Sequence, residues 1–411
     1  MKPRPDLLDD RAPEGLEIVQ LTTEPEVPSS HIYMEAQIFT PDSRRLILHR
    51  SAHAHGSDQH DPKHQYLLCD LEDGCSLTPI TTEVGATGPS ISPDGRHLYY
   101  FVNETEINGG RLTLKRVRLD GTERETLIVV DAPLPETSYR PSRIYPLSSI
   151  SSDGQRLTIS CFLGDGTEAG VTWGLMVFDL PTVSVRLIIE GQTWCNMHPQ
   201  YSRSTDPERC HDILIQENHD NTADAMGQVT RLVGGVGAEI HVIRDDGTDF
   251  RTMPWGRDGN EHCQGHQCWR GRSEWAITST GTLQPPEAQL IEGRAVPFAG
   301  HSGLNSPGAE RNDLSRDFDN PHFYHFGTDI AGERLITDCG PLNEQASVWV
   351  ARFGEPGAEA LGDWTYLLTA RCTCQKSTHL HPFLSPDGAR GFFNSDESGL
   401  LQAYMVMGFA P

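Results

Sequence analysis

The histidines of this chain are spaced so that several of them could bind a metal ion or transfer protons together. His198, His266, His325 and the pair His379 and His381 each lie shortly before a polar turn between two apolar runs. A neutral imidazole binds divalent transition metals through nitrogen and accepts a proton near neutral pH. Because residues i and i+2 of a strand share a face, the two members of the pair can reach one ion.

The turn that follows each of these histidines belongs to a repeat that runs through the whole chain. An apolar run, a polar turn and a second apolar run occur seven times, at intervals of roughly 50 to 65 residues. The clear copies are AQIFTPDSRRLILH (36–49), PSISPDGRHLYYFV (89–102), SSISSDGQRLTISCF (148–162) and HPFLSPDGARGFFNS (381–395), and degenerate copies centre on Asp206, Arg272 and Gly332. Pro-Asp-Gly and Ser-Asp-Gly sequences favour tight β-hairpins.

This repeat predicts an all-β, seven-bladed β-propeller. Two further strand-like runs follow most hairpins, which gives the four strands of one blade. The last unit supplies only three strands, whereas 16–22 forms a lone strand ahead of the first unit. We therefore expect the N-terminal strand to complete the last blade and close the ring. Residues 1–411 should form one domain, with 1–14 as a flexible N-terminal arm.

The predicted ring brings the histidines together. The first strand of each propeller blade lines the central channel, so histidines at the start of four neighbouring first strands should face the same mouth. His325, His379 and His381 would then supply three nitrogen ligands to a divalent metal ion, and open positions would remain for a substrate oxygen. Gln375 lies four residues before the pair and could add a side-chain oxygen.

Composition excludes several classes of partner. The formal net charge of −24 argues against nucleic acid and anionic membranes, because a phosphate binder needs a basic surface. The start, MKPRPDLLDDRAPEG, lacks the apolar core of a signal peptide, and there is no apolar run of the length of a membrane span. We expect a cytoplasmic protein, or one outside the standard secretion route.

Two other groups of residues could bind metal. The ten cysteines include Cys263, Cys268, Cys372 and Cys374, which could hold a structural zinc ion, but neither pair has the spacing of a CxxC motif. Buried, reduced thiols are the simpler interpretation. The loop 52–63 is rich in histidine and could bind metal at the rim, although a solvated polar loop is the favoured interpretation.

Three segments resemble the oligogalacturonate lyase family: HCQGHQCW (262–269), YHFGTDIAGERLITD (324–338) and QKSTHLHPFLSPDG (375–388). The family consists of seven-bladed propellers that use a manganese ion to cleave uronate oligomers. The resemblance implies that His325, His379, His381 and Gln375 bind manganese. It also implies that His266 abstracts the proton.

The chain departs from the family pattern at two positions. The family's glutamine stands three residues before the histidine pair, where this chain has Lys376, so Gln375 is displaced by one residue. The position of a family arginine that assists the sugar carboxylate is occupied by Glu239. Arg231, in the insertion before that strand, could replace the arginine.

Other side chains are candidates for binding the sugar. The segment HPQYSR resembles the family's HPxYR, and an acidic protein needs cations where it meets an acidic substrate. The predicted substrate-binding residues are His198, Tyr201, Arg203, Arg231 and Arg143.

The predicted function is a manganese-dependent lyase that cleaves acidic oligosaccharides, such as those of pectin, by β-elimination. Two alternatives remain open. One is a lyase for another uronate glycan, such as a glucuronate-terminated side chain, because the family's arginine is missing. The other is a noncatalytic, TolB-like propeller scaffold, which shares the hairpin motif but has no need of histidines at one mouth.

Overall fold

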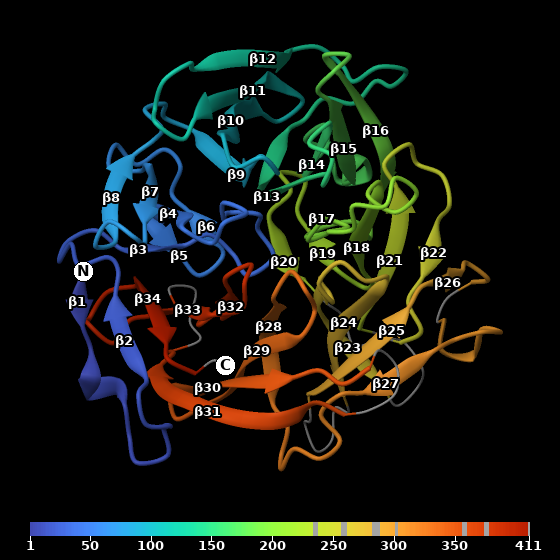
Figure 1. The fold of residues 1–411 in the computed structure, drawn as a ribbon. Coiled ribbons are helices and arrows are strands. Elements are labelled where there is room, and N and C mark those ends of the chain that lie inside the picture. Colours follow the sequence, from blue (N-terminus) through green and yellow to red (C-terminus); the bar gives the residue numbers. More distant parts are fainter. Residues whose placement is uncertain are drawn as a thin grey trace.

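The protein is a ring of seven β-sheets in the described residues (Figure 1). The computed structural model describes residues 1–232, 237–255, 261–281, 288–300, 303–355, 360–373 and 378–409. The sheets pair antiparallel strands mostly in chain order; the exceptions are the closing strands of the last sheet and β26, which follows β25 of the fifth blade but pairs with β22 of the fourth. The seven-bladed propeller predicted from the hairpin repeat is confirmed.

The first three blades are regular four-stranded sheets. From the inner strand outward, the first blade contains β3 (Ser29–His31), β4 (Arg45–Arg50), β7 (Tyr66–Asp70) and β8 (Ser76–Pro79). The second contains β9 (Ala86–Ile91), β10 (His97–Glu106), β11 (Gly109–Arg118) and β12 (Glu125–Val130). The third contains β13 (Arg143–Ile150), β14 (Arg156–Phe162), β15 (Trp173–Asp179) and β16 (Ser184–Gly191).

The next three blades begin near His198, His266 and His325 and are less regular. The fourth blade contains β17 (Gln200–Tyr201), β18 (Asp212–Asn218), β21 (Ala238–Arg244), β22 (Arg251–Thr252) and β26 (Val296–Pro297). The fifth contains β23 (His262–Trp269), β24 (Trp275–Gly281), β25 (Gln289–Arg294) and β27 (Arg311–Asp313). The sixth contains β28 (Phe323–Thr328), β29 (Arg334–Leu342), β30 (Gln345–Arg352) and β31 (Gly362–Arg371).

The N-terminal strand closes the ring, as predicted. In the seventh blade, β32 (Phe383–Leu384), β33 (Arg390–Ser395) and β34 (Gln402–Met407) are followed by β2 (Glu17–Gln20), which pairs antiparallel with β34. Figure 1 shows blue β2 beside red β34.

The expectation of a flexible arm over residues 1–14 requires correction. β1 (Lys2–Pro3) pairs with β2, and Arg4 Nη1 donates to Gln20 Oε1 and to Tyr404 Oη, each at 3.2 Å. An outer edge strand is held by backbone hydrogen bonds and needs no alternating apolar pattern, so its polar composition concealed it.

The hairpin turns form by the chemistry that their residues predict. In the second blade, Gly95 N donates to Ser92 O at 2.8 Å, and Asp94 Oδ1 accepts from Arg96 N at 3.0 Å. Gly95 has a φ of +68°, which glycine adopts without steric cost. All seven predicted turns join the first two strands of their blades, so they lie at the end of the channel away from the strand starts.

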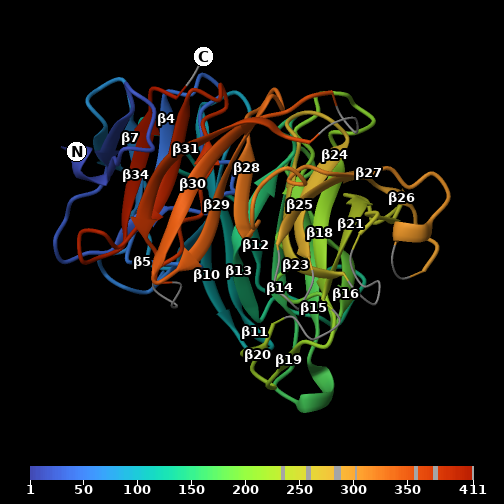
Figure 2. The ribbon, with the colours of Figure 1, turned by 90° about the horizontal axis from the view of Figure 1, so that it is seen from below.

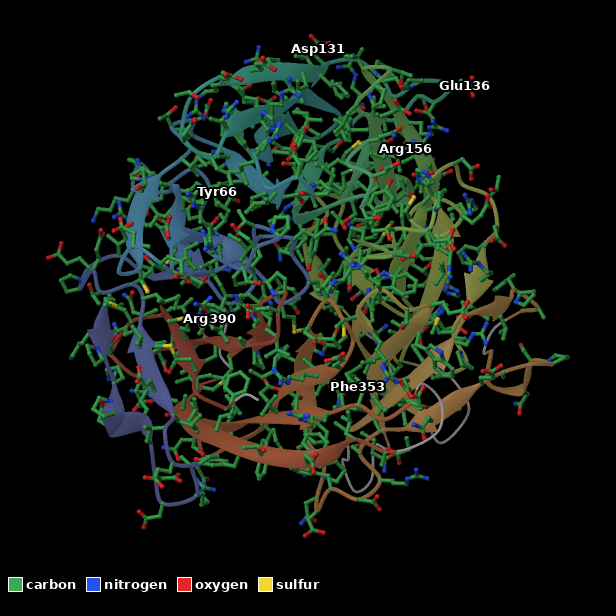
Figure 3. All side chains as sticks on the ribbon, in the orientation of Figure 1. Tyr66, Asp131, Glu136, Arg156, Phe353 and Arg390 are labelled. Atoms are coloured by element: carbon green, nitrogen blue, oxygen red, sulfur yellow. The ribbon has the colours of Figure 1, made fainter. Side chains whose placement is uncertain are left out.

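Apolar side chains from neighbouring sheets pack together to form the core. One cluster joins Val348 and Leu367 of the sixth blade to Phe393 and Tyr404 of the seventh, together with Ile18 of the closing strand. Figure 3 shows side chains filling the spaces between the sheets, while Asp131 and Glu136 lie at the outer edge of the ring.

Short elements decorate the ring. Two small hairpins, β5 (Ala52–His53) with β6 (Gly56–Ser57) and β19 (Thr222–Ala223) with β20 (Val229–Arg231), are insertions in the first and fourth blades. β5 and the β19–β20 hairpin lie on the same side of the ring (Figure 2). The helices of the described residues are the 3₁₀ turns η1 (Pro5–Leu7), η2 (Glu168–Gly170) and η3 (Gly303–Asn305). Within the described ranges, no helix has the length and apolar character to cross a membrane.

A buried ion pair within the fifth blade includes an arginine that also contacts the sixth blade. Arg270 Nη1 donates to Glu292 Oε2 at 2.9 Å, with 6% and 0% of the two side chains exposed, and Arg270 Nε donates to Gly332 O at 3.2 Å. Removing one member of such a pair leaves the other charge in a low dielectric. We expect Arg270→Met to lower the free energy of unfolding by about 3–5 kcal/mol.

Urea unfolding measures this difference. The matched control is Arg294→Met, because Arg294 is 40% exposed and pairs with Glu274 at 2.8 Å. That change should cost about 1 kcal/mol or less. Equal effects of the two substitutions would show that the buried Arg270 pair stabilises the fold no more than the exposed pair does.

Candidate functional site

Histidines from four segments meet at one mouth of the channel. His266 lies in β23, His325 in β28, and His379 and His381 lie just before β32. The ring centroids are 4.7 Å apart for His266 and His325, and 4.4 Å apart for His325 and His381. His55, at the turn between β5 and β6, lies 4.7 Å from His379. We call these five residues the histidine cluster.

Part of the histidine cluster has the geometry of a metal site. The ligand atoms of His55, His379 and His381 all lie within 4.8 Å of one another. His381 is fully buried, and neither of its ring nitrogens has a hydrogen-bond partner in the structure. An unsatisfied imidazole is costly to bury, and a metal ion would satisfy it. The donor set therefore fits a divalent transition metal.

Asp338 orients His325 toward the other imidazoles. His325 Nδ1 lies 2.6 Å from Asp338 Oδ2, and His325 N donates to Asp338 Oδ1 at 2.9 Å. A histidine whose Nδ1 is held by a carboxylate presents Nε2 as the ligand atom, an arrangement common at metal sites. His325 can therefore join the group formed by His55, His379 and His381.

His266 is suited to accept a proton. It is half-buried, and its Nδ1 atom is buried without a hydrogen-bond partner. Burial, followed by the neighbouring histidines His325 and His198, holds the pKa of His266 well below its usual range. The imidazole is therefore neutral at physiological pH, as a general base must be.

His198 is fixed by hydrogen bonds and is less available for chemistry. Its Nδ1 lies 3.0 Å from Glu35 Oε2, and its Nε2 lies 2.9 Å from Asn196 Nδ2 and 3.2 Å from Tyr145 Oη. Burial raises the pKa of Glu35, and the nearby His198 counteracts this rise. His198 therefore supports the wall of the site.

The segment between β3 and the first hairpin crosses the channel at this point. The ring of Tyr33 lies 4.4 Å from that of His381 and 5.2 Å from that of His198, so it contacts the seventh and the fourth blades. On the same segment, Gln37 Oε1 accepts from Ile150 N of the third blade at 2.5 Å. Residues 32–38, which we call the channel segment, form the floor beneath the histidines.

Irregular backbone conformations orient the histidine side chains of the site. The pairing register shifts around His266 in β23 and around His325 in β28, as in β-bulges. His198 and His381 have positive φ values of 48° and 45°. Bulges and left-handed backbone at non-glycine residues are typical of functional sites, because they point side chains where a regular strand would not.

The other predicted substrate-binding residues do not join the cluster. Tyr201 is buried and its Oη donates to Asp245 Oδ2 at 3.3 Å. Arg203 lines a pocket at the hairpin end of the channel. Arg143 Nη1 donates to Gln228 Oε1 at 3.4 Å, and Arg231 Nε donates to Asp220 O at 2.7 Å; both arginines are exposed.

The alternative zinc site finds no support among the described residues. The nine described cysteines are free thiols, and Cys263 and Cys268 face different core clusters. Cys263 Sγ lies 3.3 Å from Thr278 Oγ1, and Cys372 Sγ donates to Thr378 O at 3.8 Å. Gln375 and Cys374 lie outside the described residues.

A second group of possible ligands lies in the fourth blade. The ligand atoms of Glu217, His219 and Glu239 lie within 4.8 Å of one another. In this group the side chains hydrogen-bond to each other, with His219 Nε2 2.7 Å from Glu239 Oε2 and His241 Nε2 3.2 Å from Glu217 Oε2. Glu239 is thus a buried acceptor and cannot replace the family's arginine.

Three residues of the site were not among the predicted site residues. His55 belongs to the histidine-rich loop 52–63, for which metal binding at the rim was the less favoured interpretation, and the sequence did not show that this loop reaches the channel mouth. Glu35 interrupts an apolar run, and Asp338 follows the second apolar run of the sixth hairpin. Polar residues in these positions carry no signal until the fold places them beside a histidine.

The fold and the cluster together define a β-propeller with a histidine-rich site at one mouth of its channel. No protein-family model matches the chain, and comparison with curated proteins gives no match. Among solved structures, an oligogalacturonate lyase in complex with manganese has a TM-score of 0.69 at 19% identity, covering 96% of this chain and 93% of that one.

A second oligogalacturonate lyase, from Vibrio parahaemolyticus, has a TM-score of 0.67 at 17% identity, covering 95% of this chain and 93% of that one. At these identities the likeness shows a shared fold over nearly the whole chain. It agrees with the resemblance seen in the sequence. TolB from Acinetobacter baumannii has a TM-score of only 0.41 at 12% identity, over 84% of this chain and 76% of that one, which supports no functional inference.

Proposed function

We propose that this protein is a metal-dependent lyase that cleaves uronate-containing oligosaccharides, such as oligogalacturonate, by β-elimination. The observation that carries the proposal is the histidine cluster. It combines a group of imidazoles that fits a divalent metal with a neutral histidine beside that group. A noncatalytic scaffold gains nothing from burying these side chains together.

The proposed metal ligands are His55, His325, His379 and His381. Manganese is the ion found with a solved structure of the same fold. A bound divalent ion would neutralise the uronate carboxylate and so make the neighbouring C5 proton more acidic. Asp338 and the floor formed by the channel segment hold the ligands in place.

His266 acts as the base in this proposal. It accepts the proton from C5, a double bond forms between C4 and C5, and the C4–O4 bond breaks with its electron pair passing to the leaving oxygen. His266 lies next to His325, so a sugar bound at the metal group can place C5 against its ring. Its partial exposure gives the substrate access.

Activity measurements on purified protein test the proposal. The protein is loaded with Mn²⁺ and incubated with oligogalacturonate, with glucuronate-containing oligosaccharides and with a neutral oligosaccharide as control. The proposal predicts ultraviolet absorbance from the new conjugated double bond on at least one uronate substrate, and none on the neutral one. The absence of absorbance on every uronate substrate would reject it.

The orientation of His325 provides a separate prediction. Asp338→Asn keeps the shape of the side chain but removes the charge that holds Nδ1. We expect metal affinity to fall about tenfold, as for other carboxylates that hold a metal-binding histidine. Equilibrium dialysis with Mn²⁺ measures the change, and Asp317→Asn, at an exposed position, is the control. Equal affinity of the two variants would show that Asp338 does not position a ligand.

A further inference from the structure

A second pocket lies at the opposite end of the channel from the histidine cluster. Its volume is about 300 Å³, and it is lined by residues near the ends of the inner strands and by the hairpin turns that follow them. The channel segment contributes Met34, Gln37 and Ile38 to its wall, so this segment separates the pocket from the histidines. A cavity of this size accommodates a small organic molecule.

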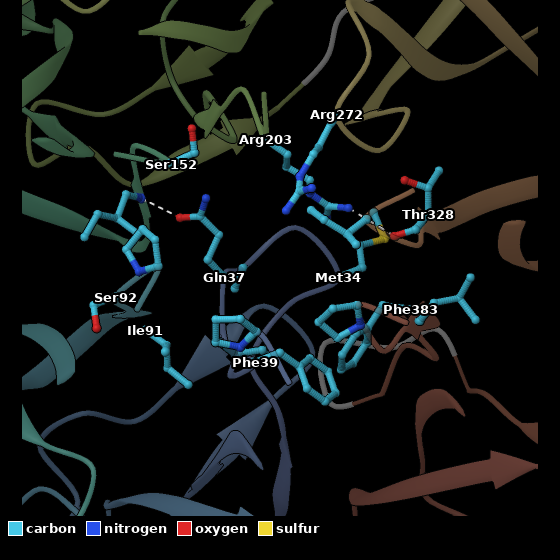
Figure 4. A pocket seen from close by; sticks show the side chains of 18 of the residues that line it. Met34, Gln37, Phe39, Ile91, Ser92, Ser152, Arg203, Arg272, Thr328 and Phe383 are labelled. Atoms are coloured by element: carbon cyan, nitrogen blue, oxygen red, sulfur yellow. Dashed lines mark hydrogen bonds between the residues drawn. The ribbon is translucent and has the colours of Figure 1, made fainter. Parts of the chain in front are cut away.

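Two arginines meet in this pocket. Figure 4 shows the side chains of Arg203 and Arg272 next to each other, with Phe39 and Phe383 elsewhere on the wall. Arg203 Nη1 donates to Thr328 O at 3.0 Å. Neither arginine forms an ion pair with any residue of the described ranges, and no aspartate or glutamate is among the described residues that line the pocket.

This arrangement is unusual in so acidic a chain. Acidic residues outnumber Lys and Arg by 57 to 33, and most buried or half-buried arginines of the fold, such as Arg156 and Arg270, have carboxylate partners. Arg203 is half-buried and Arg272 beside it is exposed, and neither has an ion-pair partner in the described ranges. Burial lowers the pKa of Arg203 because it disfavours the charged form, and the nearby Cys268 and Asp329 offset this only in part. Two adjacent guanidinium groups also repel each other. An anion between them would relieve both costs.

We infer that this pocket binds a small organic anion. Its carboxylate or phosphate group lies between Arg203 and Arg272, and its ring or hydrocarbon body packs against Phe39 and Phe383. Guanidinium groups recognise both anions through paired hydrogen bonds. The side-chain amide nitrogen of Gln37 lines the same pocket and offers a further donor, whereas the hydroxyl groups of Ser92 and Ser152 already donate to Asp94 Oδ1 and Ser204 O. The site is distinct from the proposed catalytic centre and does not depend on it.

Isothermal titration calorimetry on the full-length protein tests the inference with three probes: benzoate, a monomeric hexuronate and inorganic phosphate. We expect at least one probe to bind with one-to-one stoichiometry. Arg272→Ala should weaken that binding about 10- to 100-fold, the range for hydrogen bonds to charged groups. Arg203→Gln should weaken it as well. Binding of benzoate or hexuronate would identify a carboxylate ligand, and binding of phosphate alone would identify a phosphate ester.

Two control variants distinguish binding in this pocket from nonspecific charge effects and from binding at the histidine cluster. Arg352→Ala removes an exposed arginine from β30 with the same change in net charge, and it should leave binding unchanged. His381→Ala, in the histidine cluster, should leave it unchanged too. The inference is overturned if no probe binds, if both arginine variants bind as the unaltered protein does, or if His381→Ala abolishes binding.

Discussion

Replacing His266 with alanine should abolish turnover of uronate oligomers while the metal stays bound. The substitution removes the proposed base for the C5 proton, and positioned general bases contribute about 10²- to 10⁴-fold to rate. We therefore expect kcat to fall by about 10³-fold. The proposed metal ligands remain, so the Mn²⁺ content should not change. Initial rates from ultraviolet absorbance and metal analysis of the same sample measure both quantities.

The control for this variant is His262→Ala. His262 lies on the same strand and is also half-buried, but it is outside the histidine cluster. Its replacement should change kcat by only a few-fold. If His266→Ala keeps its activity, or if it loses metal together with activity, then His266 is not the base.

Replacing His381 with alanine should prevent metal binding. This imidazole is buried, and its two nitrogens lack hydrogen-bond partners in the structure, so the ion would be its main polar contact. Outer residues that orient ligands already contribute about 10- to 100-fold to affinity, so loss of a ligand should weaken Mn²⁺ binding by more than about 100-fold. Equilibrium dialysis measures the affinity.

Thermal unfolding gives a second readout of the same variant. A ligand that binds the folded state stabilises it by about 2.7 kcal/mol at a concentration of 100 times its dissociation constant. Added Mn²⁺ should therefore raise the Tm of the unaltered protein and of His97→Ala, a half-buried control on β10, but not of His381→Ala or His379→Ala. A normal response of His381→Ala and His379→Ala would place the metal elsewhere, for example among Glu217, His219 and Glu239.

The architecture could be predicted from the sequence because it repeats. Each hairpin turn has its own local chemistry, and seven copies define a ring even where single copies are degenerate. The spare strand at the N-terminus and the missing strand at the C-terminus then predicted the closure seen between β2 and β34. β1 was missed because an edge strand of two residues has no pattern of its own.

The site was predictable in part for the same reason. The repeat placed His266, His325, His379 and His381 at equivalent positions, and the structure brings them together. It could not place His55, because the path of an inserted hairpin depends on contacts far away in the sequence. Nor could it show the irregular backbone at His198 and His381, whose positive φ values are stabilised by their surroundings rather than by residue type.

Arg203 shows the limit of reasoning from spacing. It follows His198 by five residues, which suggested a shared site. An extended strand advances about 3.3 Å per residue, so these two side chains lie near opposite ends of the inner strand. The two residues are close in sequence but far apart in the structure, and Arg203 lies beside the hairpin turns.

The net charge of −24 has a consequence for the substrate. A strongly acidic body repels long polyanions, whereas a short uronate oligomer bound at a cationic metal group experiences mainly the local charge, because salt screens distant charges beyond about 10 Å. This favours short oligomers over polymeric pectin as substrates.

The central claim is that the histidine cluster performs elimination, and product masses test this most directly. Elimination splits a uronate oligomer into fragments whose masses sum to that of the substrate, whereas hydrolysis adds one water molecule. With Mn²⁺ present, we predict an unsaturated fragment, no added water and loss of this product in His266→Ala. Hydrolytic products, or an unsaturated product that persists in His266→Ala, would contradict the account.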